Sequence, residues 1–218
     1  MSEEVKPDRR AARRADTEAR FIAAASELFV RRGYAATTLT EVADRAGLAP
    51  RTVYLHFPTK ADLLVRCIAT AIVGDTAAVP LADRDWMAAA MTAPTLDDRI
   101  RQMAAVTALL MDRTGPLLAV ARQAAAVEPE IAAAAQAGRD DTRRTLHDFW
   151  QRAATDGLLP AGADLGWLSE TATLLAHADT YLLLRATTGW DVDVYERWLV
   201  TTWHRLVRSS LETTSMDA

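Results

Sequence analysis

The feature that most constrains the fold is a pair of short helical segments joined by a three-residue turn. The first segment, residues 39–46, starts within Thr38-Leu39-Thr40-Glu41, a pattern typical of a capping box. The turn is Gly47-Leu48-Ala49, and the second segment, residues 50–56, starts with a proline, whose missing N–H is not needed in the first helical turn. Two short helices around a glycine-containing turn are typical of the helix-turn-helix, whose second helix lies in the major groove of DNA.

Helical periodicity surrounds this motif. Residues 17–32 place five apolar side chains at the spacing of one helical face, namely Phe21, Ile22, Ala25, Leu28 and Phe29. Gly33 follows at the position expected for a left-handed C-terminal cap. We expect a further helix that is capped by Thr59, starts at Lys60 and ends at Gly74.

These patterns predict the domain organisation. We expect residues 1–15 to form a basic flexible arm and residues 16–75 a helix-turn-helix DNA-binding domain, with its motif at about 37–56. Residues 76–218 are expected to form a helical ligand-binding and dimerisation domain. No alternating strand pattern is visible, so the predicted fold is all-α with about nine helices in total.

Within the second domain, Gly and Pro residues set the expected element boundaries. Gly115-Pro116 predicts the end of one helix and the start of another, because proline removes a backbone donor. The expected elements are a long connection over 75–94 with about one helical turn near Trp86, and helices over 96–115, 116–127, 129–157, 164–188 and 193–211.

Charge is unevenly distributed along the chain. The whole chain has a formal net charge of −4, but residues 1–66 contain 12 basic and 9 acidic side chains. The front of the chain is therefore net +3, and the remaining 152 residues are net −7. A basic front and an acidic back predict that only the front meets a polyanion.

Cysteine content and hydropathy exclude further classes of protein. Cys67 is the only cysteine, which excludes an internal disulfide and a cysteine metal cluster. The longest stretch without a charged side chain, residues 86–96, has 11 residues and is too short to cross a bilayer. The N-terminus is charged and lacks an apolar signal core, so we expect a cytoplasmic protein with no membrane partner.

The sequence offers no catalytic signature. It contains no nucleophile elbow, no phosphate-binding glycine loop and no Cys–His pairing. The histidines are widely spaced and lack i,i+4 pairing; they are His56, His147, His177 and His204. We therefore expect no enzymatic activity, no catalytic residues, no cofactor and no metal site.

The front of the chain resembles a known family. The resemblance rests on Ala25, Leu28-Phe29, Gly33-Tyr34, Thr37-Thr38, Val42-Ala43, Ala46-Gly47-Leu48, Thr52-Val53-Tyr54, His56-Phe57, Lys60 and Leu63. Over about residues 16–75 this pattern is similar to the N-terminal domain of TetR-family transcriptional repressors. The far end, with Thr187-Thr188-Gly189-Trp190 and Tyr195-Glu196-x-Trp198-Leu199, resembles the last two helices of many actinobacterial-type members.

The resemblance implies an all-helical homodimer whose variable C-terminal domain binds a small molecule and releases DNA. The function expected from it is that of a sequence-specific repressor, released from a palindromic operator by a small apolar or amphipathic effector. The expected partners are operator DNA, a second copy of the chain and a small-molecule effector. Two alternatives stay open: a regulator without a small-molecule ligand that responds to a protein partner and, with much less support, an enzyme in the C-terminal domain.

DNA contacts are expected around the second helix of the motif. Arg51 can pair with guanine O6 and N7, and Thr52 can bond a base or touch a thymine methyl group. The resemblance assigns backbone contacts to Tyr54 and His56, and Lys60 offers a point charge to phosphate. The full expected set is Thr38, Pro50, Arg51, Thr52, Tyr54, Leu55, His56 and Lys60.

Four arginines precede the expected first helix: Arg9, Arg10, Arg13 and Arg14. Such an arm can enter the minor groove or hold phosphates. A solvated tail without a DNA role is an equal alternative.

The second domain holds less specific clues. Large or polar residues on its helix faces are candidates for a ligand pocket, with plain core packing as the alternative; they are Met103, Thr107, Met111, Arg122, His147, Trp150, Thr171 and His177. The last two helices are rich in large apolar residues, which predicts a four-helix dimer interface unless they pack only within the chain. The expected interface residues are Leu175, Leu182, Trp198, Thr202 and Leu206.

Overall fold

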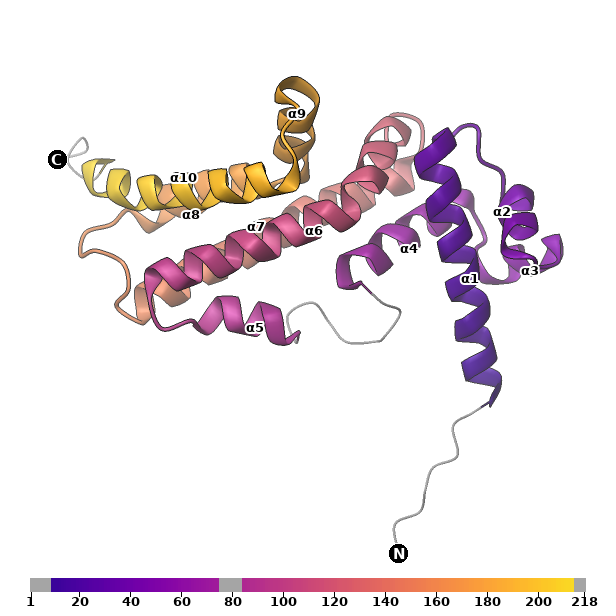
Figure 1. Cartoon of the computed structure of the whole chain (residues 1–218), viewed down its shortest axis with the longest axis horizontal. Coiled ribbons are helices and arrows are strands. Elements are labelled where there is room, and N and C mark those ends of the chain that lie inside the picture. Colours follow the sequence, from indigo (N-terminus) through magenta and orange to yellow (C-terminus); the bar gives the residue numbers. More distant parts are fainter. Residues whose placement is uncertain (1–8, 75–83, 214–218) are drawn as a thin grey trace, which may run out of the picture. The chain divides into compact units, whose positions relative to one another are not determined.

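The computed structural model describes residues 9–74 and 84–213. Over these residues the chain forms ten α-helices and no strand (Figure 1), which confirms the predicted all-α fold with one helix more than expected. The chain divides into two compact units. We call them the head unit, residues 9–74 with Pro116–Ala134, and the second unit, residues 84–115 with 135–213.

Four helices form most of the head unit. They are α1 (Arg9–Arg32), α2 (Leu39–Ala46), α3 (Pro50–His56) and α4 (Lys60–Val73). Thr38 forms a capping box with Glu41 at the start of α2, and Gly47 ends α2 in the left-handed region at φ 66°. A second capping box, between Thr59 and Asp62, starts α4. The three-residue turn between α2 and α3 is therefore where the sequence predicts it.

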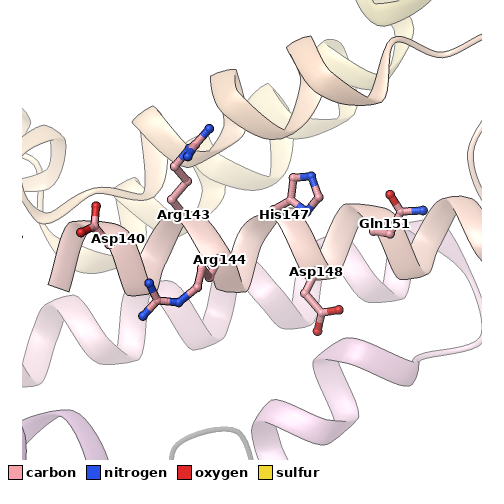
Figure 2. Close-up of a pocket in the computed structure, with 6 residues that line it drawn as sticks. All are labelled: Asp140, Arg143, Arg144, His147, Asp148 and Gln151. Atoms are coloured by element: carbon pink, nitrogen blue, oxygen red, sulfur yellow. The ribbon is translucent and has the colours of Figure 1, made fainter. Parts of the chain in front are cut away.

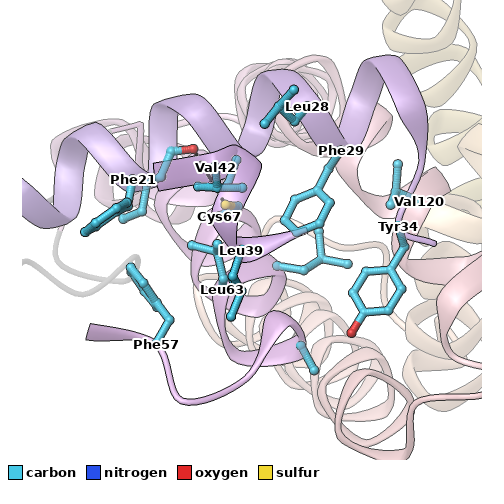
Figure 3. Close-up of a cluster of buried hydrophobic side chains, with 14 of the residues drawn as sticks. Phe21, Leu28, Phe29, Tyr34, Leu39, Val42, Phe57, Leu63, Cys67 and Val120 are labelled. Carbon is cyan, nitrogen blue, oxygen red and sulfur yellow. Dashed lines mark hydrogen bonds between the residues drawn. The ribbon is translucent and has the colours of Figure 1, made fainter. Parts of the chain in front are cut away.

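The core of the head unit takes residues from all four helices. Phe21 and Phe29 of α1, Val42 of α2, Val53 of α3 and Leu63 of α4 are fully buried (Figure 3). Burial of an apolar side chain of this size stabilises the fold by roughly 1.5–3 kcal/mol. Since Val53 is the buried residue of α3, its burial determines which face of α3 points outward.

A segment from later in the chain also belongs to this core. The buried residues that it adds are Leu117, Val120, Ala121 and Ala124 of α6 (Leu96–Ala124) and Ile131 of α7 (Pro129–Thr155). The head unit therefore includes residues that lie beyond the boundary expected at residue 75. The sequence pattern shows an apolar face here but not the partner against which that face packs.

The second unit contains the rest of α6 and α7 together with four further helices. These are α5 (Asp85–Thr92), α8 (Leu165–Ala176), α9 (Ala178–Thr188) and α10 (Val192–Thr213), of which α8 packs against α10. Its core is aromatic: Phe149, Trp150 and Trp203 are completely buried. The Trp150 and Trp203 rings meet edge to face with their centroids 6.2 Å apart, a preferred aromatic arrangement.

Two elements are longer than the sequence reading predicts. α1 begins at Arg9, so the four arginines of the expected flexible arm lie on a helix, because the arginine- and alanine-rich start of α1 consists of strong helix formers. Residues 1–8 lie outside the described part of the chain. α5 spans eight residues instead of about one turn, and its buried Met87 and Ala90 anchor it to the second unit.

The break predicted at Gly115-Pro116 is wrong, because α6 runs through it as one helix of 29 residues. The proline does remove one helical hydrogen bond. However, Thr114 and Leu117 on either side are buried, so packing holds the helix together. The glycine is explained by a close approach: a Cβ atom on Gly115 would lie 2.9 Å from the Tyr181 ring.

The single helix expected over 164–188 is also wrong, since α8 and α9 are separated at His177. The backbone of His177 is extended at φ −65° and ψ 143°, and its carbonyl accepts the Thr180 N–H at 3.0 Å. The Thr180 hydroxyl donates to the Leu174 carbonyl at 2.5 Å, so both helix ends at the break are capped. No glycine or proline marks the position, which explains why it is not visible in the sequence.

By length and composition α6 could cross a membrane. Half of its most apolar window is buried within the chain, however, and core helices of folded domains share this composition. The helix is therefore explained by its packing in the two units.

Candidate nucleic-acid interface

The outward face of α3 carries side chains that are exposed to solvent and do not pack into the core of the head unit. Tyr54 is 54% exposed and Leu55 is 73% exposed, an unusual pair of large apolar groups on a helix of seven residues. Arg51 is exposed and has no hydrogen bond or ion pair with any described residue. Pro50 and Thr52 complete the first turn, with Pro50 exposed and Thr52 half-buried. α3 thus presents a free guanidinium, a phenol and an apolar group to solvent.

α2 is held firmly at both ends behind this face. At its start, the Thr38 N–H and hydroxyl both donate to the Glu41 carboxylate at 2.9 Å. At its end, the Arg20 guanidinium of α1 donates to the Ala46 carbonyl at 2.6 Å. The N–H and the hydroxyl proton of Thr38 are therefore committed to the cap, and a phosphate, which only accepts hydrogen bonds, has to compete with the Glu41 carboxylate for them.

Ion pairs between α1 and α2 fix the angle of this brace. Glu27 of α1 binds Arg45 of α2 at 2.5 Å, and Arg32 of α1 binds Glu41 of α2 at 3.0 Å. Hydrogen bonds from Arg45 and Arg31 hold the pKa of Glu27 below its usual value. Exposed pairs of this kind contribute little to stability, so their main effect is on the orientation of α2.

His56 and Phe57 turn the chain back into the head unit. Phe57 is buried and meets Phe21 edge to face at 6.2 Å, as its core role predicts. His56 is half-buried with its ring 5.8 Å from that of Phe21. The imidazole nitrogens have no hydrogen-bond partner among the described residues, so they stay available for the expected contact with the DNA backbone.

Lys60 is placed differently from the free point charge that the sequence suggests. Its side chain is half-buried, and its ammonium donates to the Tyr34 carbonyl at 2.8 Å. The same nitrogen lies 4.2 Å from the centroid of the Tyr34 ring. Sequence reasoning missed Tyr34 as a partner of Lys60, because 26 residues separate the two and no local pattern links them.

The arginines at the start of α1 are exposed where their side chains are described. Arg13 and Arg14 have no hydrogen bond or ion pair within the described chain, whereas Arg10 does have an interaction. The side chain of Arg9 lies outside the described residues. If these arginines contact the minor groove, they do so from the first turns of α1, which residues 1–8 precede in the sequence.

The residues expected to line a ligand pocket differ in their exposure. Met103, Thr107 and Trp150 are buried in the second unit, whereas Met111, Thr171 and His177 are only half-buried there. His147 is exposed, and Arg122 is exposed and belongs to the head unit.

A polar hollow of about 470 Å³ runs along the surface of α7. Its lining residues are Asp140, Arg143, Arg144, His147, Asp148 and Gln151 (Figure 2). Arg143 and His147 point to one side of α7 and Arg144 to the other. Three of its charged side chains are paired, Arg143 with Glu170, Arg144 with Asp141 and Asp148 with Arg152.

The residues expected at a dimer interface are mostly half-buried. Leu175, Trp198, Thr202 and Leu206 have this intermediate exposure, whereas Leu182 is only 8% exposed and packs mainly within its own unit. The more exposed neighbours are Leu174 on α8 and Leu183 on α9, with exposures of 63% and 58%. Their signal in the sequence was a run of adjacent leucines in each helix, two in α8 and three in α9, since adjacent residues on a helix cannot all face inward.

Cys67 is a buried core residue with a thiol 3.7 Å from the Ile22 carbonyl oxygen. Burial raises the pKa of the thiol to about 11, so the reactive thiolate is scarce near neutral pH. Within residues 9–74 and 84–213, no three His, Cys, Asp or Glu side chains are grouped to hold a metal ion.

An all-helical chain with a braced α2, an outward α3 and unpaired cationic and aromatic groups on that helix defines a helix-turn-helix protein. A family model described as "Bacterial regulatory proteins, tetR family" matches residues 21–67, the part of the chain that contains α2 and α3. This match agrees with the resemblance seen in the sequence over about residues 16–75.

The curated relatives match over less than a quarter of the chain. The HTH-type transcriptional activator FasR of Mycolicibacterium smegmatis is 44% identical over 50 residues, which are 23% of this chain and 23% of FasR. The chain therefore aligns with less than a quarter of the length of that relative.

Solved structures extend the likeness of fold to nearly the whole chain. A protein from Mesorhizobium loti assigned to the TetR-family transcriptional regulators has a TM-score of 0.69 at 20% identity, covering 92% of this chain and 98% of its own. The SmeT–triclosan complex has a TM-score of 0.67 at 19% identity, covering 86% and 90%. At these identities the likeness shows the fold alone.

Proposed function

We propose that the protein is a repressor that binds a palindromic operator as a homodimer and is released by a small apolar or amphipathic effector. The observation that carries the DNA-binding part is the outward face of α3, where Arg51, Tyr54 and Leu55 are exposed and Arg51 has no polar partner among the described residues. Such a protein acts where the DNA is, in the bacterial cytoplasm.

The side chains of α3 divide into base-reading and backbone-binding groups. Arg51 reads guanine, while Thr52 and Leu55 contact bases through a hydroxyl and an apolar surface. Tyr54, His56 and Lys60 contact the phosphate backbone, with Thr38 and Pro50 in van der Waals contact. Arg9, Arg10, Arg13 and Arg14 extend the contact towards the minor groove.

The proposed dimerisation is based on the short length of α3, the helix that contacts the bases. A helix of seven residues is about 10 Å long and touches only a few base pairs, so useful specificity needs two copies. Leu174 and Leu183 are exposed large apolar groups on α8 and α9, which a second copy would cover. Together with the half-buried Leu175, Trp198, Thr202 and Leu206 they form the proposed interface.

The effector is proposed to bind in the second unit. The indole N–H groups of Trp150 and Trp203 are completely buried and have no hydrogen-bond partner in the described chain. An unpaired buried donor costs about 1–3 kcal/mol, and an effector with an acceptor oxygen would satisfy it. The SmeT structure, which has this fold, holds triclosan, an aromatic molecule that carries oxygen atoms.

The buried hydroxyls of Thr107 and Thr173 in the second unit already have acceptors within their own helices. Thr107 donates to the Met103 carbonyl at 2.8 Å, and Thr173 donates to the Ser169 carbonyl at 2.7 Å. The effector class that fits is therefore an apolar or amphipathic molecule with a hydrogen-bond acceptor. Trp150, Met103 and Thr107 are buried and remain candidate lining residues. Met111, Thr171 and His177 are half-buried, so they are candidates for the rim of the proposed site.

One observation favours activation as a second candidate for the direction of control. The relative FasR, which shares the helix-turn-helix, carries the name of a transcriptional activator. A helix-turn-helix does not by itself determine whether the bound protein blocks or recruits the polymerase. Transcription of a reporter placed behind the selected operator, with and without the protein, separates the two.

Selection of bound duplexes from a random pool tests the proposal. We expect an enriched inverted repeat whose half-sites are centred about 10 base pairs, or a multiple of a helical turn, apart. An enriched site without two-fold symmetry would contradict the homodimer, and no enrichment at all would contradict sequence-specific binding. A regulator that responds only to a protein partner would show the same site but no release by any small molecule.

A further inference from the structure

Tyr34, in the turn between α1 and α2, connects the start of α4 to the turn between α6 and α7. Its carbonyl accepts the Lys60 ammonium at 2.8 Å, and its ring lies 4.2 Å below the same nitrogen. Its hydroxyl donates to the Glu128 carboxylate at 3.0 Å. All three residues belong to the head unit, although 94 positions separate Tyr34 from Glu128.

The orientation of the Tyr34 ring is determined from both sides. Its ring stacks on that of Phe29 with centroids 5.9 Å apart, and only 9% of the residue is exposed (Figure 3). Burial and the neighbouring Glu128 raise the pKa of the phenol, so that it remains a hydrogen-bond donor at neutral pH. The ring therefore offers Lys60 a fixed aromatic face.

A second contact joins the same two segments. The Thr59 hydroxyl, which caps α4 through Asp62, also lies 3.3 Å from the Glu130 carboxylate at the start of α7. Thr59 and Lys60 are adjacent, so the first turn of α4 is tied to the α6–α7 turn at two points. The position of the Lys60 ammonium thus depends on more than the helix that carries it.

A lysine that is held in advance binds phosphate more tightly than a free one. A lysine side chain has about 2 kcal/mol of rotamer entropy, much of which is lost when its ammonium is immobilised. Lys60 makes one hydrogen bond and one cation–π contact, which restrict its stem while two of its three N–H groups remain for a phosphate.

We propose that Tyr34 is a positioning residue for DNA binding, which holds the Lys60 ammonium for a phosphate and is itself held by Glu128. The proposal rests on the proposed function, because it takes Lys60 as a backbone contact. It assigns to the α6–α7 turn a direct role in the DNA affinity of the head unit. The opposite role, in which Tyr34 withholds Lys60 from DNA, predicts the reverse sign.

The test is a double-mutant cycle on the full chain, with a random-sequence duplex as the probe and several salt concentrations. The variants are Tyr34→Leu, Lys60→Ala and their combination. We expect Tyr34→Leu to weaken binding by about two- to fivefold, the value of an exposed cation–π contact, with a smaller salt slope. In the Lys60→Ala background the same change should have no further effect on affinity or slope.

Tyr34→Phe and Glu128→Ala keep the test informative if the leucine variant folds poorly. Both remove the phenol–carboxylate bond and keep the aromatic ring. We expect each to weaken binding by about twofold, with no additional loss when they are combined. Thermal unfolding checks that each variant is folded, and a purely structural role of Tyr34 would lower stability without any coupling to Lys60.

The outcomes separate this inference from the proposed function. A wild-type chain that does not bind DNA would contradict the proposed function. A wild-type chain that binds, with Lys60→Ala weakening it but Tyr34→Leu equally harmful in both backgrounds, would contradict only the positioning role. Tighter binding by Tyr34→Leu would show that Tyr34 withholds the ammonium and would also overturn the inference.

Discussion

Glu27 of α1 accepts a hydrogen bond of 2.5 Å from Arg45 of α2, and this pair ties the helix that braces α3 to α1. A hydrogen bond from Arg31 at 3.0 Å reaches the other carboxylate oxygen. These two arginines lower the pKa of Glu27 from its usual 4.5. The pair therefore links the geometry of the DNA-binding motif to pH.

We expect the stability of the head unit to fall in acid partly through Glu27. Because its folded pKa is lowered, its contribution is present above the unfolded pKa and is lost as the pH falls through the folded one. Denaturant unfolding of Glu27→Gln between about pH 7 and about pH 3 should show a shallower pH dependence than the wild type. Parallel curves for the two proteins would contradict the role given to this pair.

Arg51 should determine sequence preference. Removal of its guanidinium in Arg51→Ala should weaken the best sequence by about tenfold or more and leave random DNA nearly unchanged. Lys60→Ala is the matched control, because it should weaken all sequences alike and reduce the salt slope. Binding titrations on both duplexes measure this, and equal losses on both duplexes for Arg51→Ala would remove its base-reading role.

Gly115 should resist substitution because of its contact with Tyr181. The added methyl group would lie 2.9 Å from the Tyr181 ring, so we expect Gly115→Ala to cost about 1–3 kcal/mol of unfolding free energy. Gly138 in α7 is a matched control, since nothing lies within 4 Å of its Cβ position and alanine is the better helix former. Gly138→Ala should stabilise by about 0.5–1 kcal/mol, and equal effects at the two sites would contradict the packing argument.

The dimer interface should depend on the exposed leucines. Leu174→Glu with Leu183→Glu would place charges on a surface that the second copy covers, so we expect monomers in sedimentation experiments. Leu211→Glu is a control with a partly exposed leucine at the end of α10. If the double variant stays dimeric, the interface lies elsewhere on the chain.

The buried indoles should favour ligands with an acceptor oxygen. Benzophenone and diphenylmethane have similar shapes, but only the first carries a carbonyl. We expect benzophenone to raise the unfolding temperature more than the hydrocarbon does, and Trp203→Phe to remove that difference. Equal effects of the two compounds on the wild-type chain would show that the indole donors take no part in binding.

Local signals explain why the helix-turn-helix was predictable. Thr38, Gly47 and Pro50 each affect only the neighbouring backbone, through a cap, a left-handed residue and a missing donor, and the structure shows all three as expected. Predictions failed where contacts between residues far apart in the sequence determine whether a helix continues or ends. Gly115 looks like a helix end but serves the contact with Tyr181, and His177 ends α8 without any local signal.

The candidate site shows the same division. Arg51, Tyr54 and Leu55 were predictable because position on a short helix determines their exposure once Val53 is buried. The partner of Lys60 was not, since Tyr34 reaches it only through the packing of α1 against α4. The ligand-pocket residues stay a prediction, because apolar periodicity does not distinguish a core residue from a pocket residue.

Protection of guanine N7 atoms from methylation tests the central claim most directly, because N7 lies in the major groove. With the selected operator, the account predicts two patches of protection related by two-fold symmetry, about 34 Å apart or a multiple of that distance. Arg51→Ala should lose the same guanine from both patches. Tight binding without N7 protection, or one patch without a symmetric partner, would contradict the account.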